Sequence, residues 1–163
     1  MSSLSPIHHL DLNVSNLEVS AAFYDRVLTF IGYRRVDLSA PGEPEGFDWM
    51  APDDGGPLFS IGLYRARKSR PHDRYGPGIH HLALRAKSRE EVDKLHQVLS
   101  KMDAEILDAP REYPQYEPGY YSVFFLDPDG IKLEFVFTPM NDGPSRKLTS
   151  PYPSAAQSRL RPR

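Results

Sequence analysis

Two histidines and one glutamate are the residues whose types and spacing could support chemistry. His9 lies in the segment IHHLDLNV, and His81 holds the same place in the segment IHHLALRA. Glu134 is the acid in the middle of the mostly apolar segment IKLEFVF. A buried carboxylate costs several kcal/mol unless it has a partner, and a divalent cation can be that partner where neutral imidazoles alone cannot. Two imidazoles and one carboxylate form a three-ligand site with open coordination positions, which is typical of catalytic rather than structural metals.

An internal repeat brings these residues into equivalent places. The segments IHHLDLNV and IHHLALRA match at an offset of 72 residues, and the same offset aligns the apolar residues that follow them. We therefore expect two copies of one module, joined by the polar link RKSRPHDRYG. The expected organisation is one domain at residues 1–138, with repeats at 5–66 and 77–138, and a tail rich in Pro, Ser and Arg at 139–163.

Each copy is expected to contain a strand, a helix and then about three strands. Alternation in the first strand places Leu10 and Leu12 on one face, and His9 and Asp11 on the other. Strands that follow one helix in this order favour an α+β fold, with a mixed sheet and helices on one of its faces. Helical spacing predicts two buried stripes, Val19, Phe23, Val27 and Phe30 in the first copy and Val92, Leu95, Leu99 and Met102 in the second, after caps at Ser15 or Asn16 and at Ser88.

Composition excludes several classes of function. The chain has 163 residues, no cysteine and a formal net charge of −2. Disulfides, thiolate nucleophiles and sulfur-bound metals are therefore excluded, and nothing favours a nucleic acid or a membrane surface as partner. No apolar run approaches the roughly 20 residues that a bilayer crossing needs. The N-terminus lacks the features of a secretion signal, so a cytoplasmic protein is expected.

The sequence resembles the vicinal oxygen chelate superfamily, which includes glyoxalase I, bleomycin-resistance proteins, fosfomycin-resistance proteins and extradiol dioxygenases. The resemblance rests on HLDLNV and AFY with VL in the first copy, and on HLAL and FLDPDGIKLE in the second. It implies two βαβββ modules that form a curved mixed sheet around a metal cavity, with the helices outside. It also implies one divalent metal ion (Zn, Ni, Mn or Fe) held by His9, His81 and Glu134, and a small-molecule substrate that chelates the metal through neighbouring oxygens.

Two departures from known members of this superfamily narrow the expected reaction. Glyoxalase I uses a fourth acidic or amide ligand near the end of the first copy, but the offset of 72 places Gly62 opposite Glu134 and no acid lies in that segment. This argues against a lactoylglutathione lyase. Extradiol dioxygenases and fosfomycin-resistance proteins place a functional tyrosine ten residues before the ligand glutamate, where this chain has Phe124.

The leading hypothesis is a glyoxalase-like, metal-dependent enzyme that acts on a small oxygenated substrate. Asp11 is the candidate for proton transfer, with the orientation of His9 as its alternative role. The expected substrate-binding residues are Ser122, Phe124 and Arg85, and also Tyr121 if a bulge changes the face of its strand.

Three alternatives concern function, assembly and the aromatic segment before residue 122. The protein could instead be a binding protein that sequesters an antibiotic or metabolite, or an Fe(II) ring-cleavage dioxygenase. A homodimer is expected from the resemblance, and the metal site could form within one chain or be exchanged between two. The tyrosines at 113, 116, 120 and 121 could form a lid over the cavity or a packed connection.

Overall fold

The computed structural model describes residues 7–36, 42, 44–52, 59–68 and 70–139, which include ten elements in two similar series. The tail expected at 139–163 lies outside the described residues except for Pro139. The first series is β1 (His9–Val14), α1 (Leu17–Phe30), β2 (Arg34–Val36), β3 (Gly46–Met50) and β4 (Ser60–Arg65). The second is β5 (Leu82–Arg85), α2 (Arg89–Lys101), β6 (Ile106–Glu112), β7 (Tyr121–Leu126) and β8 (Lys132–Phe137).

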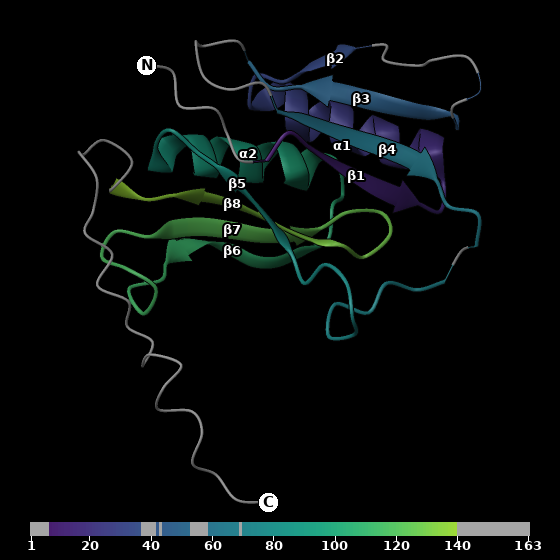
Figure 1. Cartoon of the computed structure of the whole chain (residues 1–163). Coiled ribbons are helices and arrows are strands. Elements are labelled where there is room, and N and C mark those ends of the chain that lie inside the picture. Colours follow the sequence, from purple (N-terminus) through teal and green to yellow (C-terminus); the bar gives the residue numbers. More distant parts are fainter. Residues whose placement is uncertain (1–6, 37–41, 43, 53–58, 69, 140–163) are drawn as a thin grey trace, which may run out of the picture.

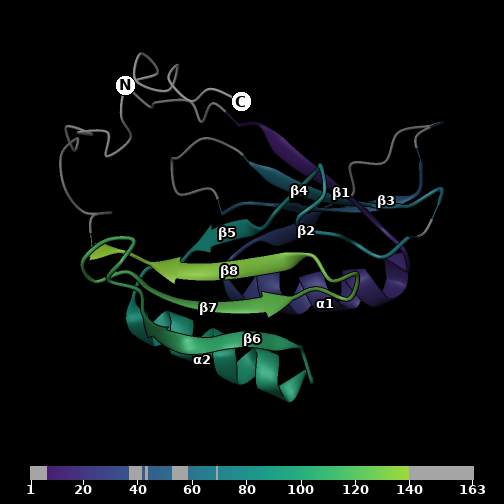
Figure 2. The same cartoon turned by 90° about the horizontal axis from the view of Figure 1, so that it is seen from below.

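Each series forms a four-stranded mixed sheet of the same topology. The first sheet has the order β1-β4-β3-β2 and the second has the order β5-β8-β7-β6. The first strand of each series pairs in parallel with the last, and the remaining pairs are antiparallel. Figures 1 and 2 show both sheets, with α2 along β6 and β7. The predicted α+β class is confirmed.

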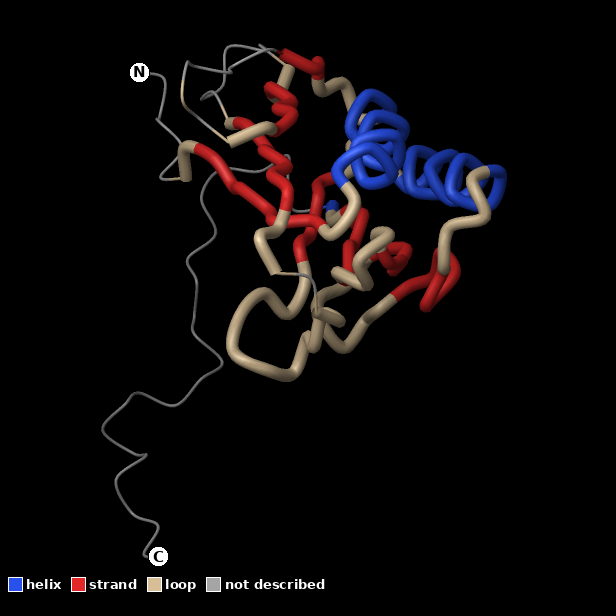
Figure 3. The backbone as a smooth tube through the Cα atoms, turned by 90° about the vertical axis from the view of Figure 1, so that its right-hand side faces the viewer, coloured by secondary structure: helices blue, strands red, loops and turns tan. Residues whose placement is uncertain are grey.

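The helices lie between the two sheets. Figure 3 shows both helices on the same side of the strands, in the angle that the two sheets make. Within one chain this differs from the expected arrangement, in which the helices lie outside a cavity. The sheet faces that carry no helix point outward and away from each other.

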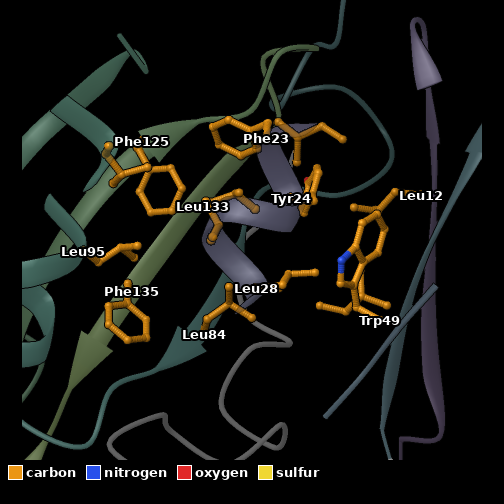
Figure 4. Close-up of a cluster of buried hydrophobic side chains, with 14 of the residues drawn as sticks. Leu12, Phe23, Tyr24, Leu28, Trp49, Leu84, Leu95, Phe125, Leu133 and Phe135 are labelled. Carbon is orange, nitrogen blue, oxygen red and sulfur yellow. The ribbon is translucent and has the colours of Figure 1, made fainter. Parts of the chain in front are cut away.

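Helix α1 is buried on two sides, because it packs against both sheets. Figure 4 shows Tyr24 and Leu28 beside Trp49 of the first sheet, whereas Phe23 reaches toward Phe125 of the second. The predicted stripe was wrong at Val19, which is 53% exposed. A helix between two layers buries more than one stripe, and the residues buried in α1 are Leu17, Ser20, Ala21, Phe23, Tyr24, Val27 and Leu28.

The helix caps follow local sequence. Asn16 caps α1, and its side chain accepts a hydrogen bond from the amide of Val19. Ser88 caps α2 through the amide of Glu91. The stripe predicted for α2 is confirmed at Val92, Leu95 and Leu99, while Met102 is the C-cap.

The turn between β7 and β8 joins the two series. The Tyr24 hydroxyl donates a hydrogen bond to Asp127 Oδ2 at 3.0 Å, and the Ser15 amide donates to the Asp129 carboxylate at 3.0 Å. Asp127 Oδ1 also accepts from the amides of Asp129 and Ile131. These bonds fasten α1 to the second sheet and help to fix the angle between the sheets. In the described part of the chain, neither helix is long and apolar enough to cross a membrane.

Candidate metal centre

Glu134 lies on the outer face of the second sheet. Its neighbours along β8, Leu133 and Phe135, are fully buried in the core beside the helices. Alternation along a strand therefore turns Glu134 to the opposite face, in register with Ala83 of β5 and Phe124 of β7. The side chain is nevertheless only 2% exposed. It is a buried acid on the side of the sheet that carries no helix.

Each carboxylate oxygen of Glu134 faces a different partner. Oε1 accepts a hydrogen bond of 2.6 Å from the Tyr120 hydroxyl, and Oε2 lies 3.4 Å from Nε2 of His81. Burial raises the pKa of Tyr120 well above its usual value, and the hydrogen bond to Glu134 and the charge of Glu134 raise it further. Tyr120 is therefore the donor in this bond at neutral pH.

His81 is suited to bind a cation as a neutral imidazole. Desolvation lowers the pKa of His81 and outweighs the opposite effect of Glu134, while Lys132 and His80 lower it further. The contact with Glu134 is therefore not an ion pair at neutral pH. A neutral imidazole keeps a lone pair for a metal ion, which a protonated imidazole cannot offer.

A second histidine contacts each candidate histidine ligand. Nδ1 of His81 lies 2.7 Å from Nδ1 of His80, and Nδ1 of His9 lies 3.0 Å from Nδ1 of His8. The ring pairs are edge-on in both copies, at 5.0 Å and 5.2 Å between centroids. In the tautomer in which His81 or His9 donates through Nδ1, Nε2 keeps its lone pair for a metal. The internal repeat therefore extends to the environment of the two histidines.

One chain does not bring the three predicted ligands together. His9 lies on β1 of the first sheet, where its Nε2 is 3.7 Å from Oδ2 of Asp11. Among the residues that the structure describes, no three His, Asp or Glu side chains lie close enough together to hold one metal ion. The physical reason is the position of α1, which separates the sheets and turns their outer faces apart. His81 and Glu134 form two thirds of the predicted set, and His9 with Asp11 lies on a different face.

The predicted substrate-binding residues divide between the two faces of the second sheet. Ser122 and Phe124 alternate with core residues of β7 and lie on the face of Glu134, as does the exposed Arg85 of β5. The placement of Tyr121 on this face is corrected, because its hydroxyl donates to Asp93 of α2 at 2.8 Å. The register between β7 and β8 is continuous, so the bulge on which this placement depended is absent there, and the irregularities lie between β6 and β7.

Comparison with known proteins identifies the family of this chain. The family model described as Glyoxalase/Bleomycin resistance protein/Dioxygenase superfamily matches residues 6–135. The chain belongs to this superfamily. It is 29% identical over 133 residues to the uncharacterized protein YqjT of Bacillus subtilis, a match that covers 80% of this chain and 97% of YqjT. It is also 29% identical over 133 residues to the metallothiol transferase FosB of Lysinibacillus sphaericus, covering 82% of each chain.

A solved structure shows the same superfamily fold. The glyoxylase/bleomycin resistance protein/dioxygenase domain from Frankia sp. EAN1pec has a TM-score of 0.64 and 23% identity, and the match covers 82% of this chain and 92% of that one. At this level of identity the likeness concerns the fold.

At Gly62, the position in this chain that corresponds to Glu134 in the first repeat, two carboxylate side chains crowd the glycine. A Cβ on Gly62 would lie 2.5 Å from Oδ1 of Asp11 and 2.9 Å from Oδ1 of Asp48. Both carboxylates come from the strands on either side of β4, and Asp48 is only 8% exposed. The two repeats therefore differ at this point, with an acid on β8 and two acids around a glycine on β4.

Sequence reasoning missed the contact of Tyr120 with Glu134. Tyr120 was grouped with a loop, although it alternates with Ser122 and Phe124 and so shares their face. This parity was visible in the sequence and could have identified the residue. The distance of 2.6 Å to a buried carboxylate could not be read from it.

Proposed function

We propose that two copies of the chain associate about a two-fold axis and form two equivalent divalent-metal sites. Each site would take His9 from one copy, and His81 and Glu134 from the other. The edges of the sheets support this arrangement, because β1 pairs only with β4 and β5 pairs only with β8 in the described part of the chain. A symmetric contact between β1 of one copy and β5 of the other uses the same surfaces twice and is closed.

The donor set fits a divalent cation. Glu134 is a buried carboxylate whose described contacts are a phenol and an imidazole, and neither of these carries a positive charge at neutral pH. His81 and His9 each have Nδ1 in contact with another histidine and Nε2 on the side of a carboxylate. Imidazole and carboxylate ligands suit Zn, Ni, Mn or Fe, and this set does not select among them.

The proposed activity is a glyoxalase-like reaction on a small oxygenated substrate. The metal would supply Lewis-acid polarisation of a substrate oxygen. Arg85 is an exposed cation on the face of Glu134 and would attract a negatively charged part of the substrate. Asp11 would accept a proton from the substrate at a carboxylate oxygen, or would orient His9, from which it lies 3.7 Å. Ser122 and Phe124 would line the pocket.

The buried Glu134 between Tyr120 and neutral His81 is the observation that carries this proposal. The glycine at position 62 supports a reaction other than that of a lactoylglutathione lyase, because it offers no side chain as a fourth ligand there. The similarity to FosB, which is named a metallothiol transferase, favours a second candidate in which a thiol is transferred to the substrate.

A complementation experiment tests the shared site. His9→Ala and His81→Ala chains with different tags are co-expressed, and the mixed dimer is purified through both tags. If sites are shared, the mixed dimer has one intact site and one site that lacks both histidines, so it binds one Zn²⁺ tightly. Each single variant alone binds none tightly. A mixed dimer that binds Zn²⁺ no better than either single variant contradicts a shared site. A wild-type protein that binds no divalent cation contradicts the proposed metal site.

The reaction class is tested by turnover. The metal-loaded wild type is screened with methylglyoxal and glutathione, with a thiol together with an electrophile that can accept it, and with a catechol under dioxygen. Glu134→Gln is the control. Dioxygen consumption with bound iron would replace the proposed glyoxalase-like reaction with ring cleavage. Metal-dependent binding without turnover would favour a sequestration protein.

A further inference from the structure

We infer that Tyr120 is a positioning residue that holds Glu134 in the orientation required for metal binding. The inference rests on the proposed metal site. Tyr120 belongs to the segment between β6 and β7, and its hydroxyl is 2.6 Å from Oε1 of Glu134. The other oxygen, Oε2, faces Nε2 of His81 at 3.4 Å. The phenol therefore occupies one carboxylate oxygen and leaves the other beside the neighbouring ligand.

This division of the two oxygens has a consequence for coordination. A glutamate side chain has three rotatable bonds, and a metal can take either carboxylate oxygen or both. A short bond from Tyr120 holds Oε1 and would leave Oε2 available to a metal. Hydrogen bonds to metal ligands typically change metal affinity by about 10–100-fold when they are removed. Tyr120 would thus favour coordination through one oxygen.

The backbone of its segment holds Tyr120 in place. The Tyr113 amide donates to the Tyr120 carbonyl at 2.9 Å, and the Tyr120 amide donates to the Glu117 carbonyl at 3.2 Å. Gly119 has a φ of +80°, which permits the sharp turn immediately before the tyrosine. The segment therefore delivers the hydroxyl from a backbone that is itself hydrogen-bonded.

The aromatic rings of the same segment restrict the Tyr120 side chain. The Tyr120 ring lies edge-on to the ring of Tyr116, at 5.2 Å between centroids, and to that of Tyr113, at 6.3 Å. Tyr113 packs in turn against Phe124 at 5.2 Å. These contacts leave the phenol little freedom to move away from Glu134. A tyrosine that had to leave before a metal could bind would be expected in a looser setting.

The adjacent residue provides a matched control. Tyr121 is the next tyrosine in the chain, but it lies on the opposite face and its hydroxyl donates to Asp93 of α2. Tyr120→Phe and Tyr121→Phe therefore each remove one hydroxyl and one hydrogen bond to a carboxylate. Only the first touches the proposed metal ligand.

The test measures metal affinity rather than turnover. Zn²⁺ dissociation constants are obtained by competition with a chelator, and the visible absorption spectrum of the Co²⁺-loaded protein reports ligand geometry. We expect Tyr120→Phe to weaken Zn²⁺ binding about 10-fold or more and to change the Co²⁺ spectrum. Tyr121→Phe should leave both unchanged. Unfolding curves of the metal-free proteins show whether either variant is folded.

Three results would overturn the inference. Unchanged affinity and spectrum in Tyr120→Phe would show that the hydroxyl does not position Glu134. Tighter binding would show that Tyr120 blocks the metal. Loss of folding in Tyr120→Phe alone would make the residue structural. If wild type itself binds no divalent cation, the proposed function fails together with the inference, whereas a failure confined to Tyr120→Phe leaves the metal site standing.

Discussion

Replacement of Glu134 by glutamine should change stability in opposite directions with and without metal. The carboxylate is 2% exposed, and it contacts one phenol hydroxyl and one neutral imidazole. Burial of a charged carboxylate costs several kcal/mol. The charge-assisted bond from Tyr120 returns about 1.5–3 kcal/mol, and a glutamine oxygen would retain about 0.5–1.5 kcal/mol of it.

These magnitudes predict the sign of each effect. In the metal-free protein, Glu134→Gln removes the cost of burying a charge, and this cost equals or exceeds the hydrogen-bond energy that the substitution loses. Glu134→Gln should therefore be at least as stable as wild type, with a gain of up to about 2 kcal/mol. At a cation concentration 100 times the dissociation constant, binding stabilises wild type by about 2.7 kcal/mol. The variant lacks the anionic ligand and should gain almost nothing.

Thermal unfolding with and without Zn²⁺, at fixed protein concentration, measures both effects. About 1 kcal/mol corresponds to roughly 2–4 °C for a chain of this size. Glu105→Gln is the control, because that side chain is exposed and outside the proposed site. A metal-free Glu134→Gln protein more than about 1 kcal/mol less stable than wild type, combined with no effect of Zn²⁺ on wild type, would refute the reasoning. Glu134 would then be a structural residue.

Two further substitutions test the join between the sheets and the charge beside the site. Tyr24→Phe should cost about 1–3 kcal/mol in urea unfolding at pH 7, because it leaves the buried Asp127 without one of its donors. Burial raises the pKa of Tyr24 well above 10. The contribution of Tyr24 to the free energy of unfolding is therefore complete below pH 10 and is lost as pH rises through the folded-state pKa. In that alkaline range the wild type should lose its stability advantage over the variant. An advantage that persists unchanged would contradict this assignment. Lys132→Met should raise the pKa of His81, which Lys132 lowers, and should strengthen divalent-cation binding a few fold. Proton NMR titration of the metal-free protein measures the pKa of His81, and Zn²⁺ competition measures the affinity. Weaker Zn²⁺ binding in Lys132→Met would contradict this prediction and would show that Lys132 supports metal binding.

Much of the fold could be predicted from local patterns. Alternation in β1 and β8 identified the faces of His9 and Glu134, because side chains of a strand point to opposite sides at each residue. Helical spacing identified the buried residues of α2, which packs mainly against one sheet. The same reasoning was less accurate for α1, where Val19 is exposed. Because α1 contacts both sheets, it also buries Leu17, Ala21 and Tyr24, which lie outside the predicted stripe. Periodicity describes one contact surface and does not reveal a second.

Of the three ligands predicted from the sequence, the structure brings His81 and Glu134 together and leaves His9 apart within one chain. The choice of His81 and Glu134 followed from the repeat and from the cost of a buried acid, and the two side chains lie 3.4 Å apart. Tyr120 was not predicted as a site residue, because tyrosine-rich segments are common in packed loops. Its position just before the strand nevertheless places it on the same face as Phe124. Tyr121 would share the face of Glu134 only if its strand carried a bulge, and the register between β7 and β8 is continuous.

The sequence alone determined the two repeats and which residues share a face of each strand, because both are local consequences of chain geometry. Only the tertiary structure decided how the two sheets face each other. That relation depends on side chains of α1 that pack on both sheets, and on the bonds from Tyr24 and Ser15 to the turn before β8. These long-range contacts turn His9 away from Glu134 within one chain. No local pattern in the sequence contains that information.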